Sequence, residues 1–473
     1  MAISRSTWPP VPANSTDSDR TWTSRRWCIR RSRSRHSSSA CRSKPPKASR
    51  SSSNWKTLSR LCGASPRSPS QARKGAMRSR SRCVSFATSS ERCRGFPRCG
   101  PASVPVPEVL IVAGEASGDL HGAALADRLR VIRPDLILTG VGGSRMESAG
   151  VRLLERTTGI IGFVEVLRHI PAHWRLLRRL RARFASGEVG LAVLIDYGGF
   201  NLRVAAAARA VGVPVLYYIT PQVWASRAGR LKTMARVITR AAVILPFEEA
   251  LLRAHGVDAT FVGHPLLDRA TDLPSKAEAR RRLGMREDGE ILALFPGSRA
   301  QEIRLHTADF VAVARELERR RPGLRVVVGV APTVSIDPAE FPFQLLRAPA
   351  FDLLRAADVA LCKSGTTTLE AAIAGCPCAV VYRTNAMTYE IVKRLVRITH
   401  IGLVNIVVGR EVVPEFVQAA FQPIPVADAL EPLFDPASPA RATMLAGLAD
   451  VRAQLGEPGA SERVAQMVAG MIR

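Results

Sequence analysis

The sequence predicts an α/β protein with two doubly wound parallel sheets, and three observations lead to this fold class. Short apolar runs recur along the chain, as in residues 109–113, and are typical of strands buried on both faces. They alternate with segments of helical periodicity, the order that produces parallel sheets. The chain has 473 residues, which is enough for two or three domains with sizeable cores.

Residues 1–105 differ in composition from the rest. The formal charge is +28, of which +20 lies in the first hundred residues, with 23 Lys and Arg against 3 Asp and Glu. This Arg/Ser-rich segment has no regular period and too few apolar residues for a core. It fits a nucleic-acid-binding arm, an organellar transit peptide, or translation from a start chosen too far upstream. We favour the last, with a functional start near Val104 or Val106 and no nucleic-acid partner.

The first α/β domain is predicted over residues 106–267, with strands at 109–113, 136–140, 189–195, 213–219, 242–245 and 259–262. Helices are expected at 120–130 and 202–210. Ligands of parallel sheets bind beyond the carboxyl ends of the strands. Each polar residue there fits a cap or turn, but seven at one edge predict a substrate-binding site: Glu115, Ser117, Asp119, Asp196, Asn201, Gln222 and His264.

Residues 159–184 interrupt this alternation. An apolar stretch, 159–167, precedes a basic amphipathic helix in which Trp and Leu oppose Arg. Two interpretations are equally open: an interfacial helix on anionic lipid, or a core helix with a solvated basic face. No run of eighteen apolar residues occurs, so no membrane-spanning helix is predicted.

The second domain is predicted over 268–430, with strands at 291–295, 324–330, 359–361 and 379–382. Helices are expected at 301–321 and 351–357, and helices in 431–473 are expected to return to the first domain. Three cysteines, Cys362, Cys376 and Cys378, fit core positions in a reducing cytoplasm, because their spacing matches neither a metal site nor a disulfide framework. We expect no metal and no other cofactor.

A phosphate site is predicted where strand 359–361 leads through Ser364, Gly365 and Thr366 into a helix. Unpaired N–H groups and the helix dipole favour an anion there. Arg299, on another strand-to-helix loop, suits a diphosphate, and Glu370 suits ribose hydroxyls. Each feature has a simpler alternative. Arg299 fits an ordinary surface arginine, and the helix after residue 366 fits an ordinary capped helix, with Ser364 or Thr366 as N-cap and Glu370 in a capping box.

Short distinctive motifs occur in order from about residue 109 to the C-terminus. They are residues 112–119, 162–167, 221–227, 245–248, 261–265, 294–299, 364–370, 381–383 and 409–413, with Asn405. Together these motifs resemble the lipid-A-disaccharide synthase family. The resemblance implies the B-type glycosyltransferase fold, in which two Rossmann-like domains face a cleft.

The family joins UDP-2,3-diacylglucosamine to 2,3-diacylglucosamine 1-phosphate with inversion, releasing UDP. The resemblance implies a peripheral enzyme at the cytoplasmic face of the inner membrane and leaves a homodimer open. It implies Asp196 as general base, Glu115 and Asn201 on the facing rim, and a nucleotide site at Arg299, Ser364, Gly365, Thr366, Glu370 and Asn405.

Two departures from the family pattern concern Tyr197-Gly198-Gly199, where Ala-Pro-Asp is usual, and Ser226, where Trp is common. Two other functions remain open. A UDP-N-acetylglucosamine 2-epimerase has the same architecture but does not need the surface of residues 159–184. A nucleic-acid-binding protein would lose its binding on deletion of residues 1–103.

Overall fold

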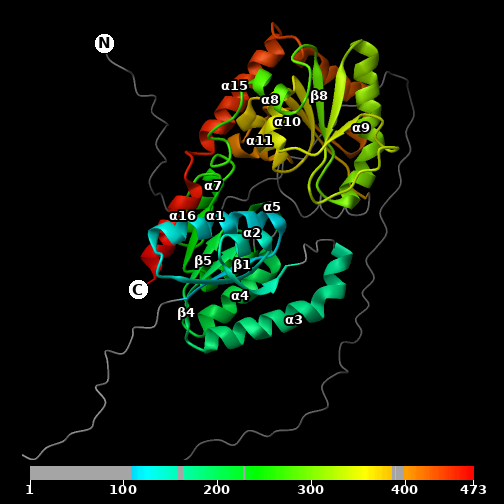
Figure 1. The fold of residues 1–473 in the computed structure, drawn as a ribbon. Coiled ribbons are helices and arrows are strands. Elements are labelled where there is room, and N and C mark those ends of the chain that lie inside the picture. Colours follow the sequence, from blue (N-terminus) through cyan, green and yellow to red (C-terminus); the bar gives the residue numbers. More distant parts are fainter. Residues whose placement is uncertain (1–107, 158–162, 227–228, 386–388, 390–398, 473) are drawn as a thin grey trace, which may run out of the picture. The chain divides into compact units, whose positions relative to one another are not determined.

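The computed structural model describes residues 108–157, 163–226, 229–385, 389 and 399–472, all within one compact unit. The expectations for residues 1–105 and for Ile160 and Ile161 lie outside the described residues, as do the side chains of Phe163 and Val164. Two parallel sheets are present, one of seven strands and one of six, with helices beside them (Figure 1). The predicted fold class is confirmed.

The seven-stranded sheet has the order β3-β2-β1-β4-β5-β6-β7. Its strands are β1 (Glu108–Ala113), β2 (Ile137–Gly142), β3 (Arg152–Arg156), β4 (Val189–Ile195), β5 (Val215–Tyr218), β6 (Arg240–Val243) and β7 (Ala259–Phe261). The strand order reverses between β1 and β4, whose register pairs Ala113 with Ile195. The loops after these two strands are therefore adjacent at the switch point, where such sheets bind ligands.

Helices cover both faces of this sheet. One core cluster contains residues of α1 (Ala116–Ile132), α2 (Ser144–Ser148) and α16 (Ala460–Met471), and another contains residues of α3 (Phe163–Ala185), α4 (Gly198–Ala210) and α6 (Gly229–Val237). Figure 1 shows α1 and α2 on the opposite side of the sheet from α3 and α4. The remaining helices of this region are α5 (Val223–Ser226) and α7 (Pro246–Ala254).

The six-stranded sheet has the order β10-β9-β8-β11-β12-β13. Its strands are β8 (Ile291–Phe295), β9 (Arg325–Gly329), β10 (Gln344–Leu346), β11 (Val359–Lys363), β12 (Cys378–Tyr382) and β13 (Glu415–Val417). Here the order reverses between β8 and β11. Its helices are α8 (Lys276–Arg282), α9 (Ala300–Arg320), α10 (Ala350–Ala356), α11 (Thr367–Ala374), α13 (Leu403–Val408), α14 (Pro423–Leu430) and α15 (Pro439–Gln454).

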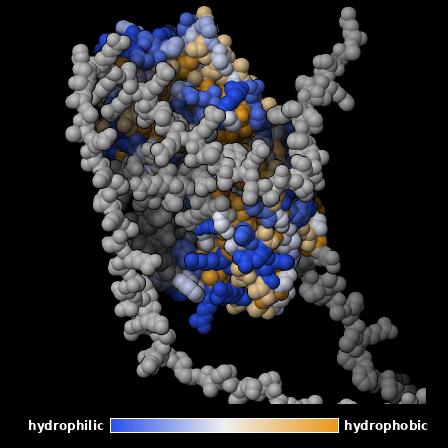
Figure 2. Space-filling view, turned by 180° about the vertical axis from the view of Figure 1, so that it is seen from behind, coloured by the Kyte–Doolittle hydropathy of each residue, from blue (hydrophilic) through white to orange (hydrophobic). Residues whose placement is uncertain are grey.

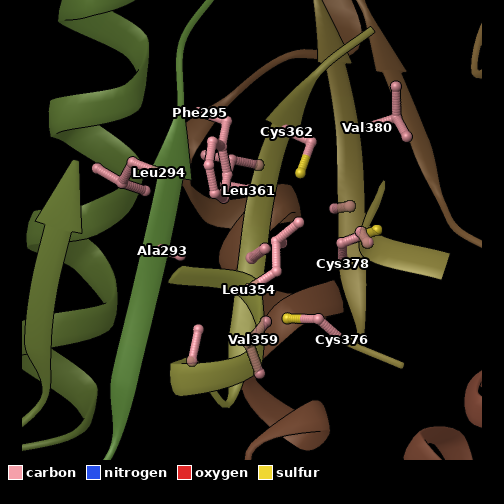
Figure 3. Packing of buried hydrophobic residues seen from close by; sticks show 14 of the residues in the cluster. Ala293, Leu294, Phe295, Leu354, Val359, Leu361, Cys362, Cys376, Cys378 and Val380 are labelled. Carbon is pink, nitrogen blue, oxygen red and sulfur yellow. The ribbon is translucent and has the colours of Figure 1, made fainter. Parts of the chain in front are cut away.

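The three cysteines of this region are buried among apolar side chains, as expected (Figure 3). Sequence patterning missed β3, β10 and β13, which are short edge strands. Their residues are only partly buried or exposed, so they carry no continuous apolar run.

The two C-terminal helices belong to different cores. Residues of α15 pack in the cluster of the six-stranded sheet, and residues of α16 pack in a cluster of the seven-stranded sheet. The carboxylate of Asp268 accepts hydrogen bonds from the backbone N–H groups of Gly459, Ala460 and Ser461 at 2.6–3.1 Å. These bonds satisfy orphan donors at the start of α16 and fasten it to the segment that joins the sheets.

Candidate active site

The end of β4 is held by a buried asparagine. The Asn201 amide donates to the carbonyl oxygens of Val112 at 3.3 Å, Ile195 at 3.1 Å and Asp196 at 2.9 Å. The Tyr217 hydroxyl also donates to the Asp196 carbonyl, at 2.7 Å. Asn201 thus ties the ends of β1 and β4 together, and its amide nitrogen is committed to the protein.

Asp196 and Tyr197 both have left-handed backbones, with φ of 49° and 53°. Asp tolerates this conformation better than most residues, whereas a tyrosine there is unusual. Tyr197, not Asp196, is the N-cap residue of α4, and its side chain makes no cap hydrogen bond. The alternative that Asp196 serves only as a helix cap therefore has no support in the structure.

The Tyr197 side chain explains how the departure at residues 197–199 is accommodated. Its ring lies against Gly114, where any Cβ would clash with it. The ring also packs near Phe200 and His173, and the Tyr197 hydroxyl shares a hydrogen bond with His173 Nε2 of α3. Tyr197 therefore connects the loop of Asp196 to α3.

Four charged side chains interact near the ends of β1, β4 and β8: Glu115, Asp196, Arg299 and Glu302. One Arg299 nitrogen is 3.5 Å from Glu115 Oε2, and another is 3.5 Å from Glu302 Oε1. Burial raises the pKa of Glu115, and the charge of Asp196 raises it further. Burial also raises the pKa of Asp196, while a hydrogen bond from the Tyr197 backbone and the charge of Arg299 oppose that rise. The arrangement supplies a carboxylate more basic than usual near a guanidinium.

The loop before α11 differs from an ordinary capped helix. The N-cap residue is Thr366, which makes no side-chain cap bond, and the Ser364 hydroxyl donates instead to the Ile401 carbonyl at 2.8 Å. Glu370 is buried, which raises its pKa, and it lies 3.6 Å from Arg269. No hydrogen bond is described for the backbone N–H groups of residues 365–367 in the part of the chain that the structure covers. This loop keeps donors available for an anion.

The side chains of two further predicted site residues are fully engaged in hydrogen bonds within the protein. The Asp119 carboxylate accepts from the backbone N–H groups of Gly143, Arg145 and Met146 at 2.7–3.1 Å. Asn405 is fully buried, donates to Val413 and Glu415, and accepts from the backbone of residues 412 and 413. We assign both residues to shaping the loops around the site.

Of the remaining predicted residues, Ser117, Gln222 and Thr366 are exposed and His264 is buried. His264 Nδ1 accepts from the Leu266 backbone, so Nε2 carries the proton of the neutral ring. Burial, with the nearby His121, lowers the pKa of His264 to about 3. His264 therefore presents a fixed neutral N–H donor.

Sequence reasoning missed Lys363 and Glu302. Lys363 Nζ lies 2.8 Å from Glu302 Oε1, and Glu302 Oε2 accepts from the Ser298 backbone at 3.0 Å. The signal was available, because Lys363 directly precedes Ser364 and Glu302 lies one turn after the loop of Arg299. Within the described ranges, no group of three or more His, Cys, Asp or Glu side chains is arranged to hold a metal ion.

Two parallel-sheet α/β domains define the class of proteins with the B-type glycosyltransferase fold. The glycotransferase of kitacinnamycin has this fold, with a TM-score of 0.55 and 17% identity over 78% of this chain and 100% of that one. UDP-GlcNAc 2-epimerase from Neisseria meningitidis bound to UDP-GlcNAc is similar, with a TM-score of 0.53 and 11% identity over 77% of this chain and 100% of that one.

The chain belongs to the lipid-A-disaccharide synthetase family, whose model matches residues 109–467. Lipid-A-disaccharide synthase from Myxococcus xanthus is 40% identical over 375 residues, which are 77% of this chain and 98% of that protein. The enzyme of the same name from Syntrophus aciditrophicus is 41% identical over 376 residues, again 77% and 98% of the two chains. The resemblance stated from the sequence is confirmed.

Proposed function

We propose that the chain is a lipid-A-disaccharide synthase, an inverting glycosyltransferase. Its donor is UDP-2,3-diacylglucosamine and its acceptor is 2,3-diacylglucosamine 1-phosphate. The products are the β(1→6)-linked disaccharide 1-phosphate and UDP. The observation that carries this proposal is the grouping of Asp196, Glu115 and Arg299 in a chain that spans nearly the full length of its named relatives.

Asp196 acts as the general base in this proposal. Its carboxylate takes the proton of the acceptor 6-hydroxyl while that oxygen attacks the donor's anomeric carbon. The bond from that carbon to the diphosphate oxygen breaks, and its electrons leave with UDP. A base needs a pKa close to the working pH, and the burial that raises the pKa of Asp196 moves it in that direction. The unpaired N–H groups of residues 365–367 and the Arg299 guanidinium stabilise the departing diphosphate.

The direct test supplies purified protein with the acylated donor and acceptor in detergent micelles and follows UDP release and the disaccharide product. We expect both products in equal amounts. A parallel reaction with UDP-N-acetylglucosamine alone tests the epimerase alternative, for which the shared fold is the supporting observation. Formation of the 2-epimer without any disaccharide would overturn the assignment.

The acylated substrates lead us to propose, in addition, that α3 docks on the anionic cytoplasmic surface of the inner membrane. Leu177, Leu180 and Phe184 on one face of α3 are buried in the core. Trp174 is 59% exposed, and Arg178 is exposed one turn later on the same face. A tryptophan beside arginines on an exposed face is typical of interfacial helices.

Trp174 is one of several large apolar side chains exposed among the described residues, and Val131 at 77% and Ile424 at 60% are others. Hydrophobic and hydrophilic residues are interspersed over the described surface that Figure 2 shows. Among the described helices, none is both long enough and apolar enough to cross a bilayer. In this proposal, contact with lipid is made by Trp174 together with the exposed arginines of α3.

Co-sedimentation with vesicles tests the docking of α3. Trp174→Ser should release the protein from vesicles containing phosphatidylglycerol, and binding of the parent should weaken in high salt. Val131→Ser is the matched control, because Val131 is 77% exposed on α1. Equal sedimentation of the Trp174 variant and the parent would assign this helix to packing alone.

A further inference from the structure

Lys363 lies between the two loops of the six-stranded sheet that carry the proposed nucleotide site. The register of β8 and β11 pairs Phe295 with Cys362, so residues 296–299 and residues 364–366 leave neighbouring strands at the same edge. Lys363 is the last residue of β11. Its ammonium nitrogen would be 3.9 Å from a Cβ placed on Gly365, so the charge lies beside the loop with unpaired N–H groups.

Glu302 holds this lysine and Arg299 together. Lys363 Nζ is 2.8 Å from Glu302 Oε1, and an Arg299 nitrogen is 3.5 Å from the same oxygen. The Lys363 and Arg299 side chains thus share the Glu302 carboxylate. Arg299 also forms an ion pair with Glu115, which follows β1 of the seven-stranded sheet. An anion entering between the loops would meet both cations at once.

The competing interpretation is a structural ion pair that closes the sheet edge. The same strand provides a comparison at its other end, where Asp358 accepts from Lys276, from Arg280 at 3.0 Å and from the Ile291 backbone at 2.8 Å. The Lys276–Asp358 ion pair is therefore part of a larger network, in which Asp358 has three donors. Lys363 has three N–H donors, and Glu302 is the one hydrogen-bond acceptor described for it among the residues that the structure covers. Its ammonium also lies over the Tyr382 ring, 5.6 Å from the ring centroid, a contact that uses no oxygen or nitrogen acceptor. A largely buried ammonium with unused donors suits a ligand better than a structural pair.

We propose that Lys363 is a second cation of the nucleotide site and binds the diphosphate of the donor. This inference rests on the proposed function, since it assumes a UDP-sugar on this sheet. Lys363 supplies a compact charge with several donors, while Arg299 supplies a planar fork, so the two contact different oxygens of one diphosphate. Glu302 keeps both side chains directed at the same place.

Calorimetric binding of UDP and of uridine to the full chain tests this role. Lys363→Met should weaken UDP binding about ten- to a hundredfold and leave uridine binding unchanged, because uridine has no phosphate. Lys363→Arg should recover part of the UDP affinity. Lys276→Met is the matched control and should leave the ratio of the two affinities as in the parent.

Removing Lys363 leaves the largely buried Glu302 with Arg299 as the one cation described beside it, which costs stability in the single variant. The double variant Lys363→Met with Glu302→Gln, compared with Glu302→Gln alone, removes that difficulty. A UDP to uridine affinity ratio that is unchanged in both comparisons would overturn the inference while the proposed function stands. A parent that binds no UDP would instead overturn the proposed function.

Discussion

Replacing Asp196 by Asn tests the proposed base most directly, because the structure predicts that the fold will survive the change. Asn tolerates a left-handed backbone as well as Asp does, and φ at this position is 49°. The Asn201 and Tyr217 side chains donate to the backbone carbonyl of Asp196, which the substitution keeps. Burial raises the pKa of Asp196, so the ionised carboxylate disfavours the folded state at neutral pH. The variant should therefore melt at the same temperature as the parent or slightly higher.

The expected loss of rate is large. Removing a general base costs about 10²–10⁴ in rate, which corresponds to about 3–5 kcal/mol in the activation barrier. Losing one ordinary hydrogen bond costs about 1 kcal/mol, or roughly fivefold. A fall in kcat of a hundredfold or more, with unchanged UDP affinity, therefore separates a base from a residue that only helps to hold a loop.

The assay is turnover of saturating donor and acceptor, measured across pH. In the parent, the rate should fall as the pH drops through the raised pKa of Asp196, because protonation removes the base. The pH–rate profile of the variant should lack this fall at acidic pH, its acidic limb. Asp127→Asn, an exposed position on α1, is the control for loss of one carboxylate. A folded Asp196 variant that keeps turnover within tenfold of the parent, with the same pH dependence, would refute the reasoning.

Three other changes have defined outcomes. Arg299→Ala should raise KM for the donor about ten- to a hundredfold, because a cation that binds the diphosphate is lost. It should also move the acidic limb of the pH–rate profile to higher pH, because the charge that lowers the pKa of Asp196 is gone. Unchanged kinetics would place the diphosphate elsewhere. Glu370→Ala should weaken uridine and UDP binding equally, and calorimetry showing a loss for UDP alone would contradict a ribose contact. Burial raises the pKa of Glu248 to about 7 from 4.5, so the parent should lose about 3 kcal/mol of unfolding free energy as pH rises from about 4.5 to 7. Glu248→Gln should remove most of that loss in denaturant titrations at pH 5 and pH 8, and an equal pH dependence in both proteins would exclude Glu248 as its source.

The sequence alone determined the fold class and the edges at which the site lies. Continuous apolar runs are a local signal of strands buried on both faces, and alternation with helices makes the sheets parallel. Because the carboxyl ends of parallel strands share one edge, the strand pattern is enough to place residues far apart in the chain, such as Glu115 and Asp196, close together.

The tertiary structure alone decided which polar side chains at those edges remain available. Asp119 and Asn405 look like site residues in the sequence, yet their hydrogen bonds go to backbone groups of other segments. Glu302 and Lys363 each adjoin a predicted site loop in the sequence, but they become a pair only because β8 and β11 are neighbours. A hydrogen bond depends on position and direction within a few tenths of an ångström, and packing sets that precision where local pattern does not.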